Sequence, residues 1–104
     1  MRLSYQPDFL ESISEQAEYL GREGGFSLAA RFIEAVQETT EQIRQMPFLG
    51  FTREFRSSKL QNVRVWRVKG FEKYLIFYVP KEDRVEFFYL IHSARDYAKL
   101  FDEE

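Results

Sequence analysis

The fold of this chain is decided by one stretch, 63-VRVWRVKGFEKYLIFYVPKEDRVEFFYLIH-92. Its β-branched and aromatic residues favour strands, in three runs separated by short turns. We expect strands at Val63–Val68, Lys73–Val79 and Arg84–His92. Parallel strands would need crossovers of about a dozen residues or more, so these three are expected to form an antiparallel meander.

The pattern of the first half predicts a short strand followed by two helices. Arg2–Tyr5 is a candidate strand, and Pro7 suits the first turn of a helix, where a missing N–H costs nothing. Apolar residues then recur at helical spacing as far as Gly24 and Gly25, and again up to Pro47. Two helices joined by so short a turn are expected to form an antiparallel hairpin.

One more helix is predicted at the C-terminal end, because Ser93 and Asp96 have the spacing of a capping box. Residues 51–62 are expected to form a loop. The predicted order is β-α-α-β-β-β-α, in a single domain of residues 1–104. The expected class is α+β: an antiparallel sheet of three main strands plus the N-terminal strand, packed on the helical hairpin, with a short C-terminal helix.

Both faces of the predicted sheet are apolar, which is unusual for a sheet with one face in water. Alternation along the last strand predicts Val85, Phe87, Tyr89 and Ile91 on one face, opposite Phe88 and Leu90. The helical hairpin can cover one face. On the other we expect an aromatic groove for a partner, unless the C-terminal helix and the 51–62 loop cover it.

Composition favours a soluble protein of the cytoplasm. The chain has no cysteine, which excludes disulfides and thiolate metal sites. It has no signal-peptide pattern and no apolar run near the roughly 18 residues of a membrane span. We therefore expect no membrane association, and we expect neither a metal nor a cofactor.

The net charge of −2 hides an asymmetry. Residues 1–50 carry four Arg or Lys against eight Asp or Glu, whereas residues 51–104 carry eleven against nine. The excess of positive charge lies in Arg53, Arg56, Lys59, Arg64, Arg67, Lys69 and Lys73. Such a strip can meet phosphates or an acidic peptide, or it can protect an edge strand from aggregation. With a sequence pI near 5.5, direct binding of nucleic acid by the chain alone is not expected.

Several short motifs occur in an order that resembles a known family. Residues 64–66 (RVW), 68–71 (VKGF) and 74–78 (YLIFY) resemble the central block of ParE-type toxins. Residues 91–96 (IHSARD) resemble their closing His-x-Ala-Arg-Asp motif. Pro47, Gly50 and Arg53 match the Pro-x-x-Gly-x-x-Arg stretch of that family. The similarity to the RelE/ParE toxin superfamily covers nearly the whole chain.

The resemblance implies a toxin of a type II toxin–antitoxin pair, neutralised by a cognate antitoxin that is ParD-like or similar. ParE-type members are associated with inhibition of DNA gyrase and with plasmid stabilisation, whereas RelE-type relatives cleave mRNA on the ribosome. The shared fold does not choose between these activities. We expect a binding inhibitor of gyrase rather than an enzyme. An endoribonuclease, or a toxin fold that has lost its activity, is the alternative.

The candidate site residues fall into three sets. A nuclease must stabilise a charged phosphoryl group and move protons. The residues that could do so are Arg64, Arg67, His92, Arg95 and Tyr97, although their spacing forms no catalytic signature. The expected target-binding residues are Arg53, Arg64, Arg67, Lys73, Tyr89 and Arg95. The expected antitoxin-binding residues are the aromatic Trp66, Phe71, Tyr74, Tyr78 and Phe88.

Structural roles compete with these assignments. His92 precedes a turn and can bond to nearby backbone instead of transferring a proton. Arg64 shares a strand face with Trp66 and can stack on its indole, and Arg95 can lock the sheet to a loop or face a target. Many ParE-type relatives have arginine where this chain has Tyr89, so its last strand lacks a charge that they carry.

Overall fold

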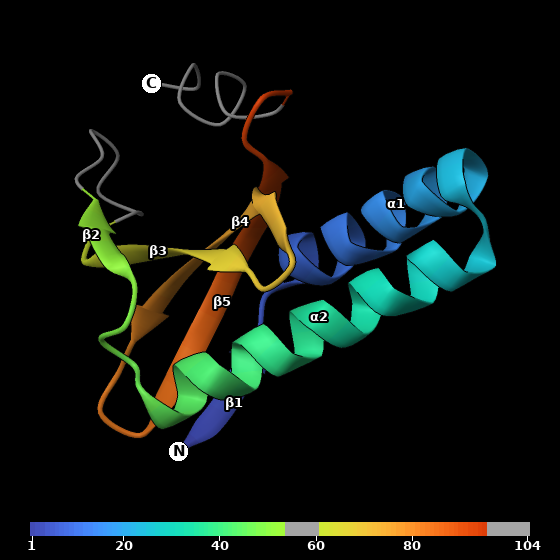
Figure 1. The fold of residues 1–104 in the computed structure, drawn as a ribbon. Coiled ribbons are helices and arrows are strands. Elements are labelled where there is room, and N and C mark those ends of the chain that lie inside the picture. Colours follow the sequence, from blue (N-terminus) through green and yellow to red (C-terminus); the bar gives the residue numbers. More distant parts are fainter. Residues whose placement is uncertain (54–60, 96–104) are drawn as a thin grey trace.

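The computed structural model describes residues 1–53 and 61–95, which form two helices and one sheet. The elements are β1 (Arg2–Tyr5), α1 (Pro7–Gly24), α2 (Phe26–Gln45), β2 (Phe51–Arg53), β3 (Val63–Val68), β4 (Phe71–Pro80) and β5 (Arg84–His92). The strand order in the sheet is β1-β5-β4-β3-β2. The two helices lie side by side against one face of it (Figure 1). The α+β class and the helical hairpin are confirmed.

Three details of this architecture bear on the sequence prediction. Pro7 is the first residue of α1, as expected, and Gly25 turns the chain between the helices with a φ of 94°. The C-terminal helix was predicted to begin at Ser93; residues 93–95 form a turn, and the rest of that prediction, residues 96–104, lies outside the described residues. No helix in the described part of the chain is long and apolar enough to span a membrane.

Two features of the sheet differ from the prediction. Residues 51–53, expected to be loop, form the edge strand β2, which pairs antiparallel with β3. Three residues are too few to show an alternating pattern in the sequence. Strand β1 pairs parallel with β5, so the sheet is mixed rather than antiparallel throughout. The helical hairpin and strands β2, β3 and β4 separate these two strands in the sequence, which leaves ample chain for them to run in the same direction.

A bulge in β5 changes which of its residues share a face. Tyr78 pairs with Phe87 and Phe77 pairs with Tyr89, so Phe88 is an extra residue in β5. An extra residue reverses the alternation of every side chain that follows it. The prediction that Val85, Phe87, Tyr89 and Ile91 share one face was therefore wrong. The helix side carries Val85, Phe87 and Leu90, and the opposite side carries Tyr89 and Ile91.

The main core lies between the sheet and the helices, where aromatic rings fix the hairpin in place. Phe9 of α1 is fully buried, and its ring centroid lies 5.8 Å from that of Tyr5 and 5.4 Å from that of Phe87. Phe32 of α2 packs on Tyr74 with ring centroids 4.9 Å apart. Each such pair contributes about 0.5–1.5 kcal/mol beyond the burial of area.

The loop between α2 and β2 is held by Tyr78, whose side chain is fully buried. Its hydroxyl donates to the carbonyl of Pro47 at 2.9 Å and accepts from the N–H of Gly50 at 2.8 Å. Burial raises the pKa of this hydroxyl above its usual value. A Cβ at position 50 would lie 2.7 Å from that hydroxyl and 2.9 Å from the carbonyl of Val65. Glycine at this position is therefore a steric requirement.

Gly50→Ala is expected to lower the free energy of unfolding by about 1–3 kcal/mol, because the new methyl group overpacks the loop. Gly21→Ala is the matched control. Inside α1 its Cβ would meet only the Cβ of Ala29, at 3.6 Å. That variant should gain about 0.5–1 kcal/mol from helix propensity. Urea denaturation measures both, and a Gly50→Ala protein as stable as the parent would contradict the close approach.

Tyr78→Phe is expected to lower the free energy of unfolding by about 1–3 kcal/mol at neutral pH, because two main-chain groups lose their partner. As the pH rises above about 10, the unfolded chain releases the hydroxyl proton before the folded chain does, so stability falls. The Tyr78→Phe variant has no hydroxyl proton at this position to release, so its free energy of unfolding should fall less steeply as the pH rises. Urea titrations between about pH 8 and 11 test this. Tyr5→Phe, at a residue 39% exposed, should behave like the parent.

Candidate functional site

Arg64 is used to hold the loop between α2 and β2. Its guanidinium donates to the carbonyl of Gly50 at 2.8 Å and to that of Phe48 at 3.2 Å. It also lies over the ring of Phe48, 4.9 Å from the centroid. Stacking on Trp66, which the sequence suggested for Arg64, belongs instead to Arg67, whose guanidinium carbon is 5.5 Å from that ring. Arg64 therefore has a structural role that accounts for its charge.

His92 ends β5 and organises the turn that follows it. Its Nδ1 accepts hydrogen bonds from the N–H groups of Ala94 at 3.2 Å and Arg95 at 3.3 Å. Because Nδ1 accepts, the proton of the neutral ring lies on Nε2. The half-buried ring meets Tyr74 edge-on, with centroids 5.0 Å apart. These hydrogen bonds agree with a structural role for His92, in which the ring bonds to nearby backbone instead of transferring a proton.

Arg95 ties this turn to α1 and to β4. Its guanidinium donates to the side-chain oxygen of Gln16 and to the hydroxyl of Tyr74, each at 3.0 Å. It also lies over the ring of Tyr19, 4.4 Å from the centroid. A shallow pocket of about 450 Å³ opens beside it, lined by Tyr19, Leu20, Phe71, Glu72, Lys73, Tyr74, His92 and Arg95.

Among the described nuclease candidates, Arg64 lies apart from His92 and Arg95, which line one shallow pocket. Arg64 of β3 pairs with Tyr78 of β4. His92 of β5 pairs with Tyr74, four positions before Tyr78, and β5 lies on the other side of β4 from β3. Strand geometry, at about 3.3 Å per residue and 4.8 Å between strands, puts the two backbones about 16 Å apart. Arg64 and His92 thus lie at opposite ends of the sheet surface, too far apart to act on one phosphate.

The other predicted target-binding residues are divided between the two faces. Lys73 is exposed and lines the shallow pocket together with Arg95. Arg67 is exposed and Tyr89 is half-buried, and both belong to the sheet face that the helices leave uncovered. The side chain of Arg53 and all of Tyr97 are outside the described residues.

The predicted antitoxin-binding aromatics do not share one surface. Tyr74 and Tyr78 are buried in the main core, at 5% and 0% exposure, and offer no side-chain surface to a partner in this structure. Trp66 and Phe71 are half-buried at the edge of the same core. Phe88 is half-buried on the opposite face of the sheet.

The face away from the helices has a small core of its own. Its buried members are Val63, Phe77, Val79 and Ile91. Much of the aromatic groove expected here is therefore covered within the chain itself. What remains is a pocket of about 300 Å³, lined by Phe51, Thr52, Val65, Trp66, Arg67, Leu75 and Phe77.

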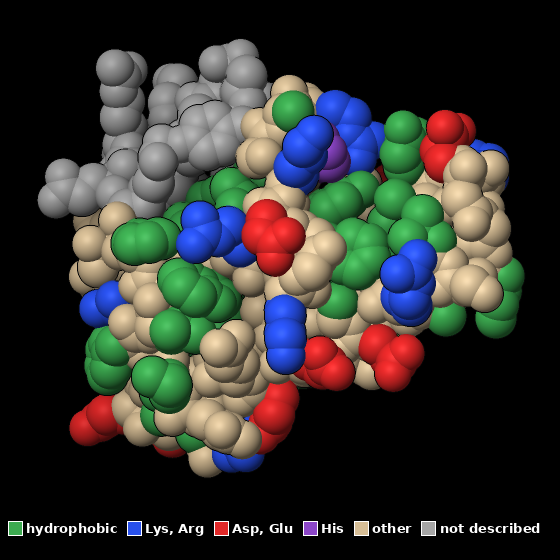
Figure 2. Space-filling view, in the orientation of Figure 1, with side chains coloured by type: hydrophobic (Ala, Val, Ile, Leu, Met, Phe, Trp, Pro, Cys, Tyr) green, Lys and Arg blue, Asp and Glu red, His purple; other side chains and the backbone are tan. Residues whose placement is uncertain are grey.

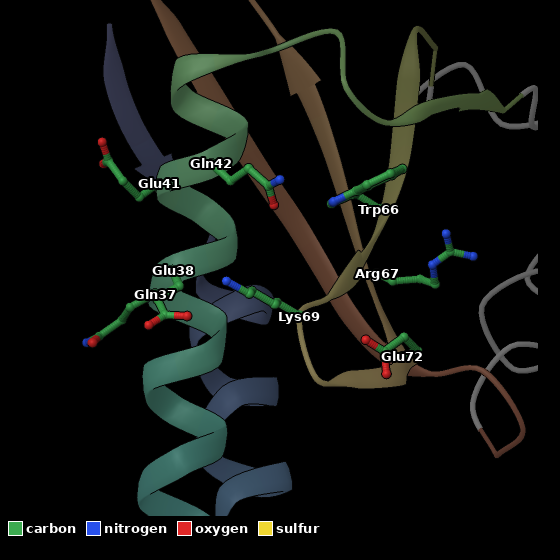
Figure 3. Close-up of a pocket in the computed structure, with 8 residues that line it drawn as sticks. All are labelled: Gln37, Glu38, Glu41, Gln42, Trp66, Arg67, Lys69 and Glu72. Carbon is green, nitrogen blue, oxygen red and sulfur yellow. The ribbon is translucent and has the colours of Figure 1, made fainter.

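A larger cleft, which we call the α2–β3 groove, separates α2 from β3 and was missed by the sequence reasoning. Its volume is about 890 Å³, and its walls are Gln37, Glu38, Glu41 and Gln42 of α2 opposite Trp66, Arg67, Lys69 and Glu72. Gln42, Trp66 and Lys69 point into the gap, whereas Glu41 and Arg67 point away from it (Figure 3). No sequence pattern marks such a cleft, because it depends on where α2 lies relative to the sheet.

The positive charges of the molecule are used in two different ways. Arg2, Arg22, Arg44 and Arg84 each pair with a carboxylate. Within residues 1–53 and 61–95, the cations of the strip on β3 and β4, Arg67, Lys69 and Lys73, form no ion pair. Carboxylates lie nearby nonetheless, because Glu38 and Glu72 line the same groove as Lys69, and Glu72 lines the shallow pocket with Lys73.

Glu41 shows that a carboxylate of the groove wall is already engaged. Hydrogen bonds from Arg44 and Gln45 lower the pKa of Glu41 to about 2. The side chain points away from the gap (Figure 3). It therefore does not neutralise Lys69.

The family model described as ParE toxin of type II toxin–antitoxin system, parDE, matches residues 3–97. The chain belongs to this family. A solved structure titled as the chromosomal ParDE toxin–antitoxin system from P. aeruginosa contains a chain similar to this one, with a TM-score of 0.71 and 13% sequence identity. The match covers 88% of this chain and 95% of that one, and at this identity it concerns the fold. No curated protein matched the sequence.

Arg95→Ala is expected to lower the free energy of unfolding by about 1 kcal/mol, because it removes two hydrogen bonds and a ring contact from an exposed residue. Arg67→Ala is the matched control, since Arg67 is also exposed but donates no hydrogen bond to a described residue. Its effect should stay within about 0.5 kcal/mol. Arg95→Lys should recover little of the lost free energy of unfolding, because an ammonium group cannot reproduce the planar donor geometry of the guanidinium. Equal losses for both alanine variants in urea denaturation would refute the role of Arg95.

Proposed function

We propose that this chain is the toxin of a type II toxin–antitoxin pair and that it inhibits DNA gyrase by binding it. Membership of the ParE toxin family over residues 3–97 supports the toxin role. In this proposal a cognate antitoxin, ParD-like or similar, neutralises the toxin by covering it. Gyrase is the target that the resemblance to ParE-type toxins implies.

The observation that carries the proposal is the separation of Arg64 from His92 and Arg95 among the described catalytic candidates. Phosphoryl transfer requires several groups held around one phosphate at the same time. Arg64 is bonded to loop carbonyls, about 16 Å from His92 by strand geometry. Arg95 is bonded to Gln16 and Tyr74. Inhibition by binding needs no such convergence, and it leaves these side chains free to hold the fold.

Two exposed lysines serve to test which surface binds the target, because they lie on different parts of the molecule. Lys73 lies at the shallow pocket beside the closing motif, whereas Lys81 lies in the turn between β4 and β5. Neither forms an ion pair with a described residue. In the proposed complex Lys73 faces gyrase and Lys81 does not.

A supercoiling assay with purified chain and gyrase tests the proposal. We expect inhibition that grows with toxin concentration and is reversed by the antitoxin. Lys73→Glu should weaken inhibition by roughly tenfold, the equivalent of about 1.4 kcal/mol, while Lys81→Glu should leave it unchanged. The same preparation should cut no mRNA in a translation reaction.

The opposite results are equally clear. Codon-specific mRNA cuts with normal supercoiling would make the chain an endoribonuclease and overturn the proposal. Normal supercoiling, uncut mRNA and unaffected growth on expression without antitoxin would show a toxin fold that has lost its activity.

A further inference from the structure

Strand β1 forms one margin of the sheet and leaves one side of its main chain unpaired (Figure 1). The N–H groups of Arg2 and Gln6 both point toward β5, where they donate to carbonyls at 3.2 and 2.9 Å. Main-chain groups alternate in direction along a strand, so Ser4 also faces β5, whereas Leu3 and Tyr5 face the open side. In the described part of the chain no strand pairs with this open side.

The open edge of β1 has few of the features that keep sheet edges from pairing. Proteins protect such edges with lysine, proline, bulges or very short strands. β1 contains neither lysine nor proline, and its register with β5 is regular. Its one charged residue, Arg2, already pairs with Asp83 at 3.3 Å. With only four residues, β1 can accept a partner strand, but a short one.

The opposite margin of the sheet, formed by β2, differs in its chemistry. Phe48 and Phe51 are 70% and 64% exposed there, and Figure 2 shows hydrophobic side chains gathered over β2 and β3. The same margin carries Arg53 on β2 and Arg67 on β3. Pairing of two copies at that edge would bring like charges together, which is destabilising. The β1 margin carries no such repulsion.

The sequence of β1 is self-complementary for antiparallel pairing with a second copy. A two-fold axis beside Ser4 places Leu3 of each copy opposite Tyr5 of the other. Both residues face the open side, so each pair exchanges two main-chain hydrogen bonds. Arg2 then lies opposite the uncharged Gln6. Any other register that pairs outward residues leaves Leu3 or Tyr5 opposite a residue outside β1, so the match is best with the axis beside Ser4.

The side chains on both faces of β1 suit the same arrangement. On the helix side, Leu3 packs against the main core and the ring of Tyr5 stacks on that of Phe87, with centroids 5.4 Å apart. Pairs of Leu3 with Tyr5 would therefore join the main cores of two copies. On the other side Ser4 meets Ser4 of the second copy, and two hydroxyl groups can share a hydrogen bond.

We propose that the outer edge of β1 is a self-association surface, through which two copies of this chain form a symmetric dimer with one continuous sheet. The two β1 strands lie antiparallel at its centre. Because β1 is short, the dimer is weak and exchanges with the monomer. An extended segment of another protein can use the same main-chain groups, but only a second copy is certain to bring Leu3 and Tyr5 in the matching register.

Concentration is the first variable of the test, with the full chain alone as the sample. Analytical ultracentrifugation should show a monomer–dimer equilibrium with a dissociation constant in the micromolar range. Hydrogen exchange at the amides of Leu3 and Tyr5 should slow by at least roughly tenfold as the dimer forms, because the open side becomes paired. The amide of Ser4, which faces β5, should be protected in the monomer already.

Charge substitution at the axis tests the register. Ser4→Lys places two ammonium groups opposite each other and should raise the dissociation constant by roughly tenfold. The monomer should stay folded, because position 4 lies beside Glu86 in the sheet. Ser14→Lys, at an exposed position of α1, adds the same charge and should leave the dissociation constant unchanged. Mixing Ser4→Lys with Ser4→Glu should restore dimers, because opposite charges then meet at the axis.

The contrary outcomes are distinct from one another. A chain that stays monomeric at every concentration, with freely exchanging amides at Leu3 and Tyr5, would refute the surface. Protection of these amides that does not depend on concentration would mean that one chain covers its own edge. A dimer that Ser4→Lys leaves intact, or that the mixture of lysine and glutamate variants does not restore, would use another contact. None of these outcomes bears on the proposed inhibition of gyrase.

Discussion

The buried hydroxyl of Tyr78 is the point where sheet, loop and helix are joined. By bonding to Pro47 and Gly50 it fixes the path of the chain from the end of α2 into β2, and Arg64 reinforces that path from β3. The position of α2 follows from this anchor together with the contact between Thr39 and Lys69. The distance between α2 and β3, and with it the groove, is therefore a product of a few polar contacts rather than of apolar packing alone.

The same contacts explain why cationic residues that look functional in the sequence serve different purposes. Arg64 and Arg95 have their donors occupied by main-chain carbonyls, an amide oxygen and a phenol, and they hold the two ends of the sheet. Arg67, Lys69 and Lys73 make no such bonds within the described residues and keep their charge for solvent or a partner. Burial and bonding, not charge, separate the cations that build the fold from those available for recognition.

The sequence predicts the elements well because long periodic runs carry a strong signal, as in Pro7–Gly24 and in the three main strands. It does not predict the bulge at Phe88, since an extra residue within the unbroken apolar run of residues 87–91 leaves no mark in the pattern. Burial of Tyr74 and Tyr78 was missed for a related reason: aromatic residues suit both a core and an interface. The α2–β3 groove arises from contacts between residues thirty positions apart, such as Thr39 and Lys69, which local spacing does not encode.

The parallel pairing of β1 with β5 has a consequence for biosynthesis. Arg2 meets Arg84 and Tyr5 meets Phe87, so β1 finds its neighbour only about eighty residues further along the chain. Contacts of such long sequence separation are costly to close and tend to form late. During synthesis β1 therefore stays without its partner until β5 has been made. Any protein that captures this strand early would keep the chain from completing its sheet.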